Sequence, residues 1–228
     1  MDERKAYALY LSQFISEKRF ALMNKVLNDR TNHITVVLED IYQTQNTSAV
    51  LRTCDCMGIQ TVHIVENKNK FDLNPDVELG SAQWLQLHRY RGKDNNTADC
   101  LNQLKQQGYR IVATTPHTRS CRIDQLPLNG KLALVFGTEK EGISPIVHEM
   151  ADEFVVIPMH GFTESYNISV SAALSLYELT KQLRQSDLNW SLPEDEKAEL
   201  LIHWIKQGLN RPELIEKDYF EKLAQGRI

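Results

Sequence analysis

The sequence predicts an α/β protein in which a mostly parallel sheet is flanked by helices, with helical extensions at both ends. Short β-branched runs alternate with helical segments across residues 34–185, a pattern typical of parallel sheets. Amphipathic helical spacing replaces this alternation in residues 1–33 and 186–228. The composition of the 228 residues, 42% hydrophobic and 25% charged, is ordinary for a soluble globular protein and excludes a disordered chain. We therefore expect an N-terminal helical extension (1–33), an α/β domain (34–185) and a C-terminal helical extension (186–228).

The N-terminal extension carries apolar residues at helical spacing, with lysines and arginines between them. These apolar residues are Tyr7, Leu11, Phe14, Ile15, Leu22, Met23, Val26 and Leu27. Their spacing predicts one amphipathic helix or a pair of helices over residues 4–28.

The central part contains six apolar runs that predict strands. They span residues 34–38, 61–65, 84–88, 110–113, 132–136 and 154–157. Helical segments fill most of the gaps, notably 47–57, 96–107, 143–150 and 167–185. In a fold of this kind, ligands bind at the carboxyl ends of the strands.

The C-terminal extension begins with a change of pattern near residue 186. Ser191 could cap a helix that has Pro193 in its first turn. Two helices, over 194–207 and 212–225, are expected to follow. The first has an apolar stripe that favours intramolecular packing or a dimer contact over ligand binding. The stripe consists of Leu200, Leu201, Trp204 and Ile205.

The four cysteines, at positions 54, 56, 100 and 121, form neither a disulfide framework nor a CxxC pair. Cys54 and Cys56 lie in a predicted helix, where a separation of two residues is about 200° of rotation. They cannot bind one ion together, so we expect reduced thiols and no metal site.

Membrane insertion and secretion are not expected. No apolar run approaches the roughly 20 residues needed to cross a bilayer. The N-terminus is charged from Asp2 to Arg4 and again at Glu17, unlike the apolar core of a signal peptide. We therefore expect a cytoplasmic protein.

The net charge of −4 argues weakly against a dedicated nucleic-acid binder, but the charge is unevenly distributed. Residues 86–122 carry a net charge of +5 and residues 1–33 carry +2, while the other segments are acidic. One interpretation is ordinary scatter of solvated charges. The other is a phosphate-binding face formed where the two segments meet.

The first of three polar segments that point to chemistry begins a predicted helix. Asn46 is a good N-cap and Gly58 a good residue after the C-terminus, so helix formation explains both. It does not explain Arg52, which has no evident partner on a helix whose Ala49, Val50 and cysteines are expected to face inward. Arg52 is therefore a candidate functional residue.

The second segment, residues 137–144, follows a predicted strand and contains an acidic turn between two glycines. Gly137 and Gly142 allow positive φ angles and a close approach of the backbone to a ligand. The glycine spacing and the lysine position differ from those of a Walker loop, and the glutamates would repel a phosphate. We do not expect a nucleoside triphosphate as the ligand.

The third segment, residues 157–173, is a loop rich in Gly, Ser, Thr and Asn that leads directly into an apolar helix with small residues. Small side chains allow backbones to pass close to one another, as in tight packing or threading. Each segment is weak evidence alone, but the three in this order are specific.

Together they resemble the signature motifs of the SPOUT methyltransferases, specifically of the TrmH branch, which methylates ribose 2′-hydroxyls of RNA. The matching patterns are N-x-x-A-x-x-R-T-x-x-x-x-G, F-G-x-E-x-x-G-(I/V)-S and I-P-M-x-G-x-x-x-S-x-N-(V/I)-S-V. The resemblance covers about residues 30–185 and extends more loosely into both helical extensions. This arrangement is similar to that of the tRNA guanosine-18 2′-O-methyltransferases.

The resemblance implies that the C-terminal part of the domain, residues 134–172, is threaded into a deep trefoil knot. The knot would hold S-adenosylmethionine in a bent conformation. The implied cofactor contacts are Thr114, Gly137, Ile157, Met159 and Tyr166. The resemblance also implies an obligatory homodimer that completes the active site across the subunit boundary.

For catalysis the matching positions are Asn46, Arg52, Glu139, Ser165 and Asn167. The reaction moves a methyl group from a sulfonium to a ribose oxygen, so the enzyme must position two atoms and deal with the hydroxyl proton. The resemblance implies Arg52 as the base, although a guanidinium is a very weak acid. A protonated Arg52 that binds the adjoining phosphate and stabilises the developing alkoxide needs no deprotonation. The other four residues would orient Arg52 and the ribose, or would cap helices and shape the knot.

We expect RNA as the partner, with guanosine 18 in the D-loop of tRNA as the target. The alternatives are a ribosomal RNA 2′-O-ribose methyltransferase and a non-catalytic RNA-binding protein on the same fold. Many ribosomal members carry an RNA-binding domain before the catalytic one, and the presence of both Arg52 and Asn167 argues against a non-catalytic protein. The candidate RNA-binding residues are Lys18, Arg19, Arg89, Arg91, Arg119 and Arg122.

A homodimer is also favoured by the helix over residues 167–185. It carries apolar residues that a small sheet is expected to cover only in part. These residues are Ile168, Ala172, Leu176 and Leu179.

Overall fold

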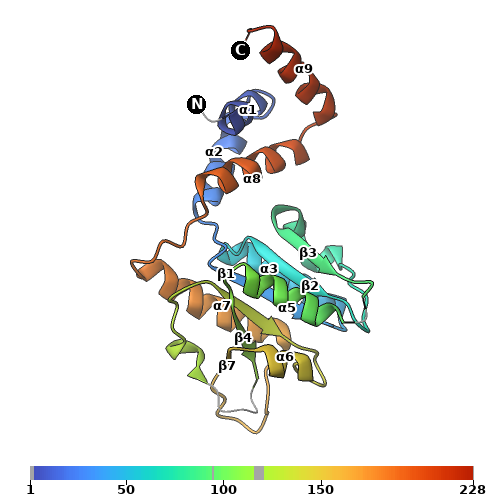
Figure 1. Ribbon diagram of the computed structural model, residues 1–228, viewed down its shortest axis with the longest axis vertical. Coiled ribbons are helices and arrows are strands. Elements are labelled where there is room, and N and C mark those ends of the chain that lie inside the picture. Colours follow the sequence, from blue (N-terminus) through green and yellow to red (C-terminus); the bar gives the residue numbers. More distant parts are fainter. Residues whose placement is uncertain (1–2, 94, 116–120, 228) are drawn as a thin grey trace. The chain divides into compact units, whose positions relative to one another are not determined.

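The structure, a computed structural model, describes residues 3–93, 95–115 and 121–227 (Figure 1). The chain divides into two compact units. One consists of Met1–Arg30 and Ser191–Ile228, and the other of Thr31–Trp190. The terminal segments, which the sequence suggested as two separate extensions, thus lie in one unit.

The terminal unit is built from the helices α1 (Glu3–Ser12), α2 (Glu17–Asn28), α8 (Glu194–Gln207) and α9 (Pro212–Ala224). The N-terminal segment forms two helices because Ser16 caps α2, its side chain accepting a hydrogen bond from the Arg19 amide. Tyr7 of α1 packs on Tyr219 of α9 with ring centroids 4.7 Å apart. The prediction that Ser191 caps α8 is wrong, because Pro193 occupies the cap position and makes no side-chain hydrogen bond.

The α/β unit is built, within the described residues, on one seven-stranded sheet in the order β3-β2-β1-β6-β4-β7-β5. All pairs of neighbouring strands are parallel, which confirms the predicted α/β class. The strands are β1 (Ile34–Glu39), β2 (Thr61–Val65), β3 (Gln86–Tyr90), β4 (Arg110–Thr114), β5 (Cys121–Arg122), β6 (Leu132–Phe136) and β7 (Glu153–Val156).

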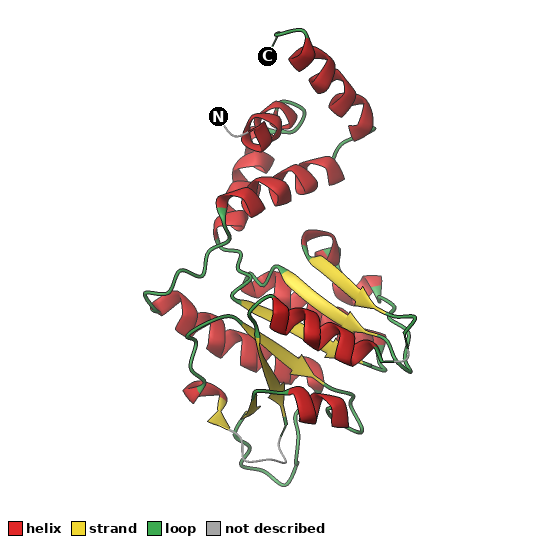
Figure 2. Cartoon of the chain, viewed as in Figure 1, coloured by secondary structure: helices red, strands yellow, loops and turns green. Residues whose placement is uncertain are grey.

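Helices cover both faces of this sheet, as Figure 2 shows. They are α3 (Thr44–Met57), α4 (Pro75–Glu78), α5 (Asn96–Gln106), α6 (Pro145–Met150) and α7 (Ile168–Gln185), with 3₁₀ turns η1 at Ser81–Trp84 and η2 at Ile123–Gln125. Residues of α3 and α7 belong to one apolar cluster, and residues of α5 and α6 belong to another.

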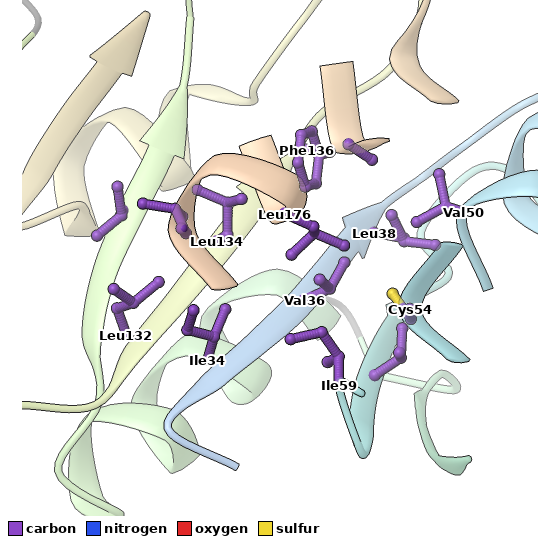
Figure 3. Packing of buried hydrophobic residues seen from close by; sticks show 14 of the residues in the cluster. Ile34, Val36, Leu38, Val50, Cys54, Ile59, Leu132, Leu134, Phe136 and Leu176 are labelled. Carbon is purple, nitrogen blue, oxygen red and sulfur yellow. The ribbon is translucent and has the colours of Figure 1, made fainter. Parts of the chain in front are cut away.

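The strand β1 contributes to both clusters because successive side chains of a strand point to opposite faces. Val36 packs toward α3 and α7, whereas Val37 packs toward α5. Figure 3 shows the first cluster, in which β1 and β6 side chains meet Val50 and Cys54 of α3 and Leu176 of α7. Burial on both faces explains why the sequences of β1 and β6 are mostly apolar.

Several predicted boundaries differ from the structure, and one short strand was not predicted. The strand predicted over 84–88 is Gln86–Tyr90, because the turn η1, entered through Gly80 at φ +80°, continues to Trp84. The helix predicted from residue 47 begins at Thr44, so Asn46 lies in its first turn and is not the N-cap. The two-residue strand β5 is too short for periodicity to predict.

Two predictions about helix faces are wrong. The apolar residues of α7 expected to be partly uncovered, Ile168, Ala172, Leu176 and Leu179, are all buried in the core. The uncovered apolar residues of α7 are Val170, Leu174 and Tyr177, which are 41–57% exposed. On α3, Cys54 is buried but Cys56 is exposed, because a turn of 200° separates them.

Candidate active site

A cavity of about 450 Å³ lies at the carboxyl ends of β4, β6 and β7, where Thr114, Phe136 and Val156 line it. Its volume falls within the roughly 300–1,000 Å³ usual for small-molecule sites. The carboxyl ends of parallel strands are where ligands bind in folds of this type. All three polar segments found in the sequence contribute to its lining.

The carboxylate of Glu139 joins the first two polar segments at this cavity. It accepts hydrogen bonds from the backbone amides of Tyr42 (3.1 Å) and Gln43 (3.2 Å) and from Asn46 Nδ2 (2.9 Å). Partial burial alone would raise the pKa of Glu139, but these hydrogen bonds outweigh it and leave the pKa below its ordinary value. Glu139 is therefore held as an anion that accepts from three donors.

The segment Gly137–Ile143, which we call the pocket loop, is closed by paired hydrogen bonds between Thr138 and Gly142. The Thr138 amide donates to Gly142 O at 2.8 Å, and the Gly142 amide donates to Thr138 O at 3.0 Å. Gly142 has a φ of +72°, which favours glycine. A Cβ on Gly137 would overlap the Gly142 carbonyl and the Ile143 amide, so the loop closes only around a glycine.

The third polar segment enters the cavity through the start of α7. Asn167 is the N-cap of this helix, and its Oδ1 accepts from the Ser169 amide at 2.8 Å. Its Nδ2 donates to Asn46 Oδ1 at 3.1 Å. Asn46 thus contacts both Glu139 and Asn167, and the three segments are connected directly.

The structure brings most of the predicted site residues to one place. The predicted cofactor contacts and four of the predicted catalytic residues line the cavity. They are Thr114, Gly137, Ile157, Met159, Tyr166, Asn46, Glu139, Ser165 and Asn167.

The cavity also has lining residues that sequence reasoning missed, among them Gln43, His148 and Ser175. Ser175 Oγ is buried and has no hydrogen-bond partner among the described residues. A polar atom of a bound molecule could satisfy it, which fits a small ligand with both apolar and polar groups. Its position in the middle of α7, where it resembles any small helical residue, gave no sequence signal.

Arg52 is the predicted catalytic residue that the structure does not bring to the cavity. It is exposed on α3 and is not among the lining residues. Asn46 and Arg52 are six residues apart, which is about 240° of rotation and roughly 9 Å along the helix. The two side chains therefore leave α3 in different directions.

Two of the predicted RNA-binding arginines lie at opposite edges of the sheet. Arg89 lies in β3 and Arg122 in β5, the two edge strands of the sheet. Six strand spacings separate these edges, roughly 29 Å. Arg89 is paired with Glu66 through two nitrogens, at 3.0 and 2.9 Å, and Arg122 is paired with Asp124.

The other candidates differ in their surroundings. Arg91 is exposed just after β3, and Lys18 is exposed in the terminal unit. The Arg19 guanidinium packs against the backbone of Gly208 at the C-terminus of α8. Arg119 lies outside the described residues.

The part of the chain that the structure describes contains no group of three or more His, Cys, Asp or Glu residues placed to hold a metal ion. None of its described helices combines the length and the apolar character needed to span a membrane.

Comparison with known proteins gives a consistent assignment. The model of the SpoU rRNA Methylase family matches residues 33–177. A tRNA (guanosine(18)-2′-O)-methyltransferase from Borreliella burgdorferi is 46% identical over 206 residues, which cover 90% of this chain and 93% of that protein. A 23S rRNA (guanosine-2′-O-)-methyltransferase from Pasteurella multocida is 30% identical over 162 residues, 70% of this chain and 64% of that protein.

A solved structure agrees with these relatives. The crystal structure of the A. aeolicus TrmH/SpoU tRNA modifying enzyme has a TM-score of 0.76 and 30% sequence identity, covering 86% of this chain and 98% of that one. The resemblance inferred from the three motifs is thereby confirmed. This chain belongs to the SpoU rRNA methylase family.

Proposed function

We propose that this protein transfers a methyl group from S-adenosylmethionine to the ribose 2′-hydroxyl of guanosine 18 in tRNA. The observation that carries the proposal is the cavity in which all three methyltransferase motifs meet. The relative that bears this activity in its name aligns with 90% of this chain and with 93% of its own length. The protein is accordingly an enzyme that acts on RNA.

The residues that would hold the cofactor are those that line the cavity at the strand ends, namely Thr114, Gly137, Ile157, Met159 and Tyr166. When bound, S-adenosylmethionine supplies an electrophilic methyl group and leaves as S-adenosylhomocysteine. The closed pocket loop offers backbone groups at close range, because Gly137 and Gly142 carry no side chain. Ser175 Oγ, in the middle of α7, offers a buried polar group in the lining of the same cavity.

Arg52 would act on the RNA rather than on the cofactor. A protonated guanidinium can bind the adjoining phosphate and stabilise negative charge that develops on the 2′-oxygen. The proton of the hydroxyl then goes to water, a phosphate or another group. Asn46, Glu139, Ser165 and Asn167 would position the ribose and the pocket walls, since they line the cavity together.

We infer that the active unit is a homodimer. The uncovered apolar residues Val170, Leu174 and Tyr177 lie on α7, which packs against α3, the helix that carries Arg52. A second copy on this face would bury them and could bring Arg52 of one copy to the cavity of the other. This arrangement would explain why Arg52 is exposed in a single chain.

The knot and the location are parts of the same proposal. We infer that residues 134–172 form the deep trefoil knot implied by the motifs, supported by the pocket loop and the start of α7 lining one cavity. A cytoplasmic protein with helical extensions at 1–33 and 186–228 accords with an enzyme that acts on tRNA. An experimental trace of residues 134–172 tests the knot.

The alternative of a ribosomal RNA substrate is less well supported. The 23S rRNA relative aligns over only 64% of its own length, whereas the tRNA relative aligns over 93% of its length. Both share the α/β domain, so the chemistry is the same and the RNA differs.

The test is to supply the full chain with S-adenosylmethionine labelled in the methyl group and three RNAs. They are a tRNA with guanosine 18, the same tRNA with 2′-deoxyguanosine at position 18, and 23S rRNA. We expect label in the first RNA only, at guanosine 18. Label in the 23S rRNA would favour the alternative, and no label in any RNA would favour a non-catalytic binding protein.

A further inference from the structure

A buried carboxylate at the carboxyl end of β1 has no part in the chemistry described above. Glu39 is only 2% exposed. Its Oε1 accepts from Thr97 Oγ1 and from Ser144 Oγ, both at 2.7 Å, and its Oε2 accepts from the Ser144 amide at 3.0 Å. These partners are two hydroxyls and one backbone amide, none of them charged. Burying a carboxylate without a cation is costly, and an apolar residue would suit this position better for stability alone.

The main partner of Glu39 is the residue at which the pocket loop ends. Ser144 follows Gly137–Ile143 directly and is the N-cap of α6, its Oγ accepting from the Val147 amide at 3.3 Å. The same hydroxyl donates a hydrogen bond to the Glu39 carboxylate. Glu39 therefore fixes the point at which the loop leaves the cavity, although neither Glu39 nor Ser144 lines it.

The contact between the two segments is reciprocal. Glu39 of the segment 39–43 reaches Ser144, while Glu139 of the pocket loop accepts from the Tyr42 and Gln43 amides. Each segment thus supplies one carboxylate to backbone amides of the other. The hairpin bonds between Thr138 and Gly142 close the turn that carries Glu139. Together they leave the pocket loop little freedom to change its shape.

The far side of the Glu39 carboxylate is fixed as well. Thr97 Oγ1, which donates to Glu39, accepts from Asn67 Nδ2 at 2.9 Å. The next residue of the chain, Asp40, accepts from the amides of Asn67, Lys68 and Asn69 at 2.8–2.9 Å. Glu39 is therefore held from the core side by groups that do not line the cavity.

We propose that Glu39 is a positioning residue, which holds the pocket loop through Ser144 in the shape that binds the nucleoside cofactor. The identity of that cofactor rests on the proposed function, but the positioning itself does not. Gln in place of Glu39 keeps the size of the side chain and replaces one acceptor oxygen by an amide donor. If the remaining oxygen keeps the bond from the Ser144 amide, the new NH2 faces Thr97 Oγ1 and Ser144 Oγ, so both hydroxyls must accept instead of donate and their own O–H groups lose the carboxylate as acceptor.

The experiment compares the full-length wild type with Glu39→Gln and with Thr35→Val as the matched control. Thr35 is buried in the same strand and donates to Thr61 O at 2.7 Å, away from the pocket loop. The Kd of S-adenosylhomocysteine is measured by calorimetry, with KM for S-adenosylmethionine and kcat at saturation. We expect Glu39→Gln to raise Kd and KM at least tenfold while kcat stays within threefold, and Thr35→Val to leave Kd within twofold.

Hydrogen exchange of the amides of residues 138–143 is measured on the same proteins without ligand. We expect faster exchange in Glu39→Gln and no change in Thr35→Val.

If the wild type binds S-adenosylhomocysteine and Glu39→Gln binds it equally well, the proposal is overturned. If the wild type does not bind it, the proposed function fails, and the exchange rates alone decide the role of Glu39: faster exchange supports it and unchanged exchange overturns it. Should Glu39→Gln fail to fold, Thr97→Val is the second variant, which keeps the carboxylate and removes the hydrogen bond to Glu39 together with the one from Asn67 Nδ2. It is expected to show the same changes at smaller size, and no change there would likewise overturn the proposal.

Discussion

Asn167 Nδ2 donates a hydrogen bond of 3.1 Å to Asn46 Oδ1, although the two residues are 121 positions apart in the sequence. Asn46 in turn donates from its Nδ2 to Glu139 Oε1 at 2.9 Å. Each asparagine donates through its amide NH2 and accepts through its amide oxygen. This chain of hydrogen bonds fixes the start of α7, the first turn of α3 and the pocket loop relative to one another.

Replacing Asn46 by Ala is expected to weaken cofactor binding at least fivefold. The variant removes the donor to Glu139 and the acceptor for Asn167, so two walls of the cavity lose their connection. The Kd of S-adenosylhomocysteine measures the effect. Asn95→Ala is the control, since Asn95 caps α5 through the Ala98 amide and should cost about 1 kcal/mol of stability without changing Kd. Equal affinities of both variants would show that the asparagine chain does not shape the site.

Gly137→Ala is expected to abolish measurable binding of S-adenosylhomocysteine. A Cβ at this position overlaps the Gly142 carbonyl, so the pocket loop must open. Gly161 provides the comparison, because it lies in the third motif but a Cβ there meets its nearest neighbour only at 4.0 Å. Gly161→Ala should bind within threefold of the wild type. A Gly137→Ala protein that binds normally would mean that the loop adapts freely.

Arg52→Ala is expected to lower kcat by about 10²–10³, the usual loss when a donor to a developing oxyanion is removed. The Kd of S-adenosylhomocysteine should not change, since Arg52 does not line the cavity. Turnover of labelled cofactor with tRNA and calorimetry measure the two quantities. A variant that keeps more than half of the wild-type turnover would refute the catalytic role.

We expect the free energy of unfolding to depend on pH because of the buried imidazole of His63. Burial, with a smaller contribution from His88, lowers its pKa from 6.5 to about 3. The folded protein therefore favours the neutral ring, while the unfolded chain takes up a proton below pH 6.5. The contribution to stability is complete above pH 6.5 and is lost as the pH falls toward 3, by about 1.4 kcal/mol per pH unit.

Urea unfolding between pH 6.5 and 4.5 measures this slope. We expect His63→Gln to remove it, because glutamine does not titrate. His203→Gln, a change at an exposed histidine of α8, should retain it. Equal slopes in the two variants would assign the pH dependence to other groups.

The salt dependence of tRNA binding should distinguish two neighbouring arginines. Arg91 is exposed, whereas the charge of Arg89 is already compensated by Glu66. We expect Arg91→Ala to reduce the slope of log K against log salt by about 1, and Arg89→Ala to leave it nearly unchanged. Identical slopes for both variants and the wild type would place the phosphate contacts elsewhere.

The sequence by itself determined the elements whose burial is uniform. The runs at 34–38 and 132–136 are continuous and mostly apolar because β1 and β6 are buried on both faces. Such strands can be predicted from the sequence without knowing which strands they pair with. The three motifs also identified many of the residues that line the cavity, since glycine, asparagine and serine at those places serve turns, caps and close approach. The prediction for the edge strand β3 was wrong by two residues, because the strand is only partly buried and its sequence shows no clear alternation of apolar and polar residues.

Only the tertiary structure decided what each polar residue contacts. Asn46 suits a helix cap by its chemistry, but it lies within the first turn and bonds to Glu139 and Asn167, which come from distant parts of the chain. Glu39 carried no signal, because a carboxylate after an apolar run looks like the solvated end of a strand. Arg89 and Arg122 belong to one basic segment and are only 33 positions apart in the sequence. They nevertheless lie at opposite edges of the sheet, because β3 and β5 are its two edge strands. Local spacing fixes which face of an element is apolar, whereas hydrogen-bond partners and the position of charges depend on contacts between segments that the sequence alone does not bring together.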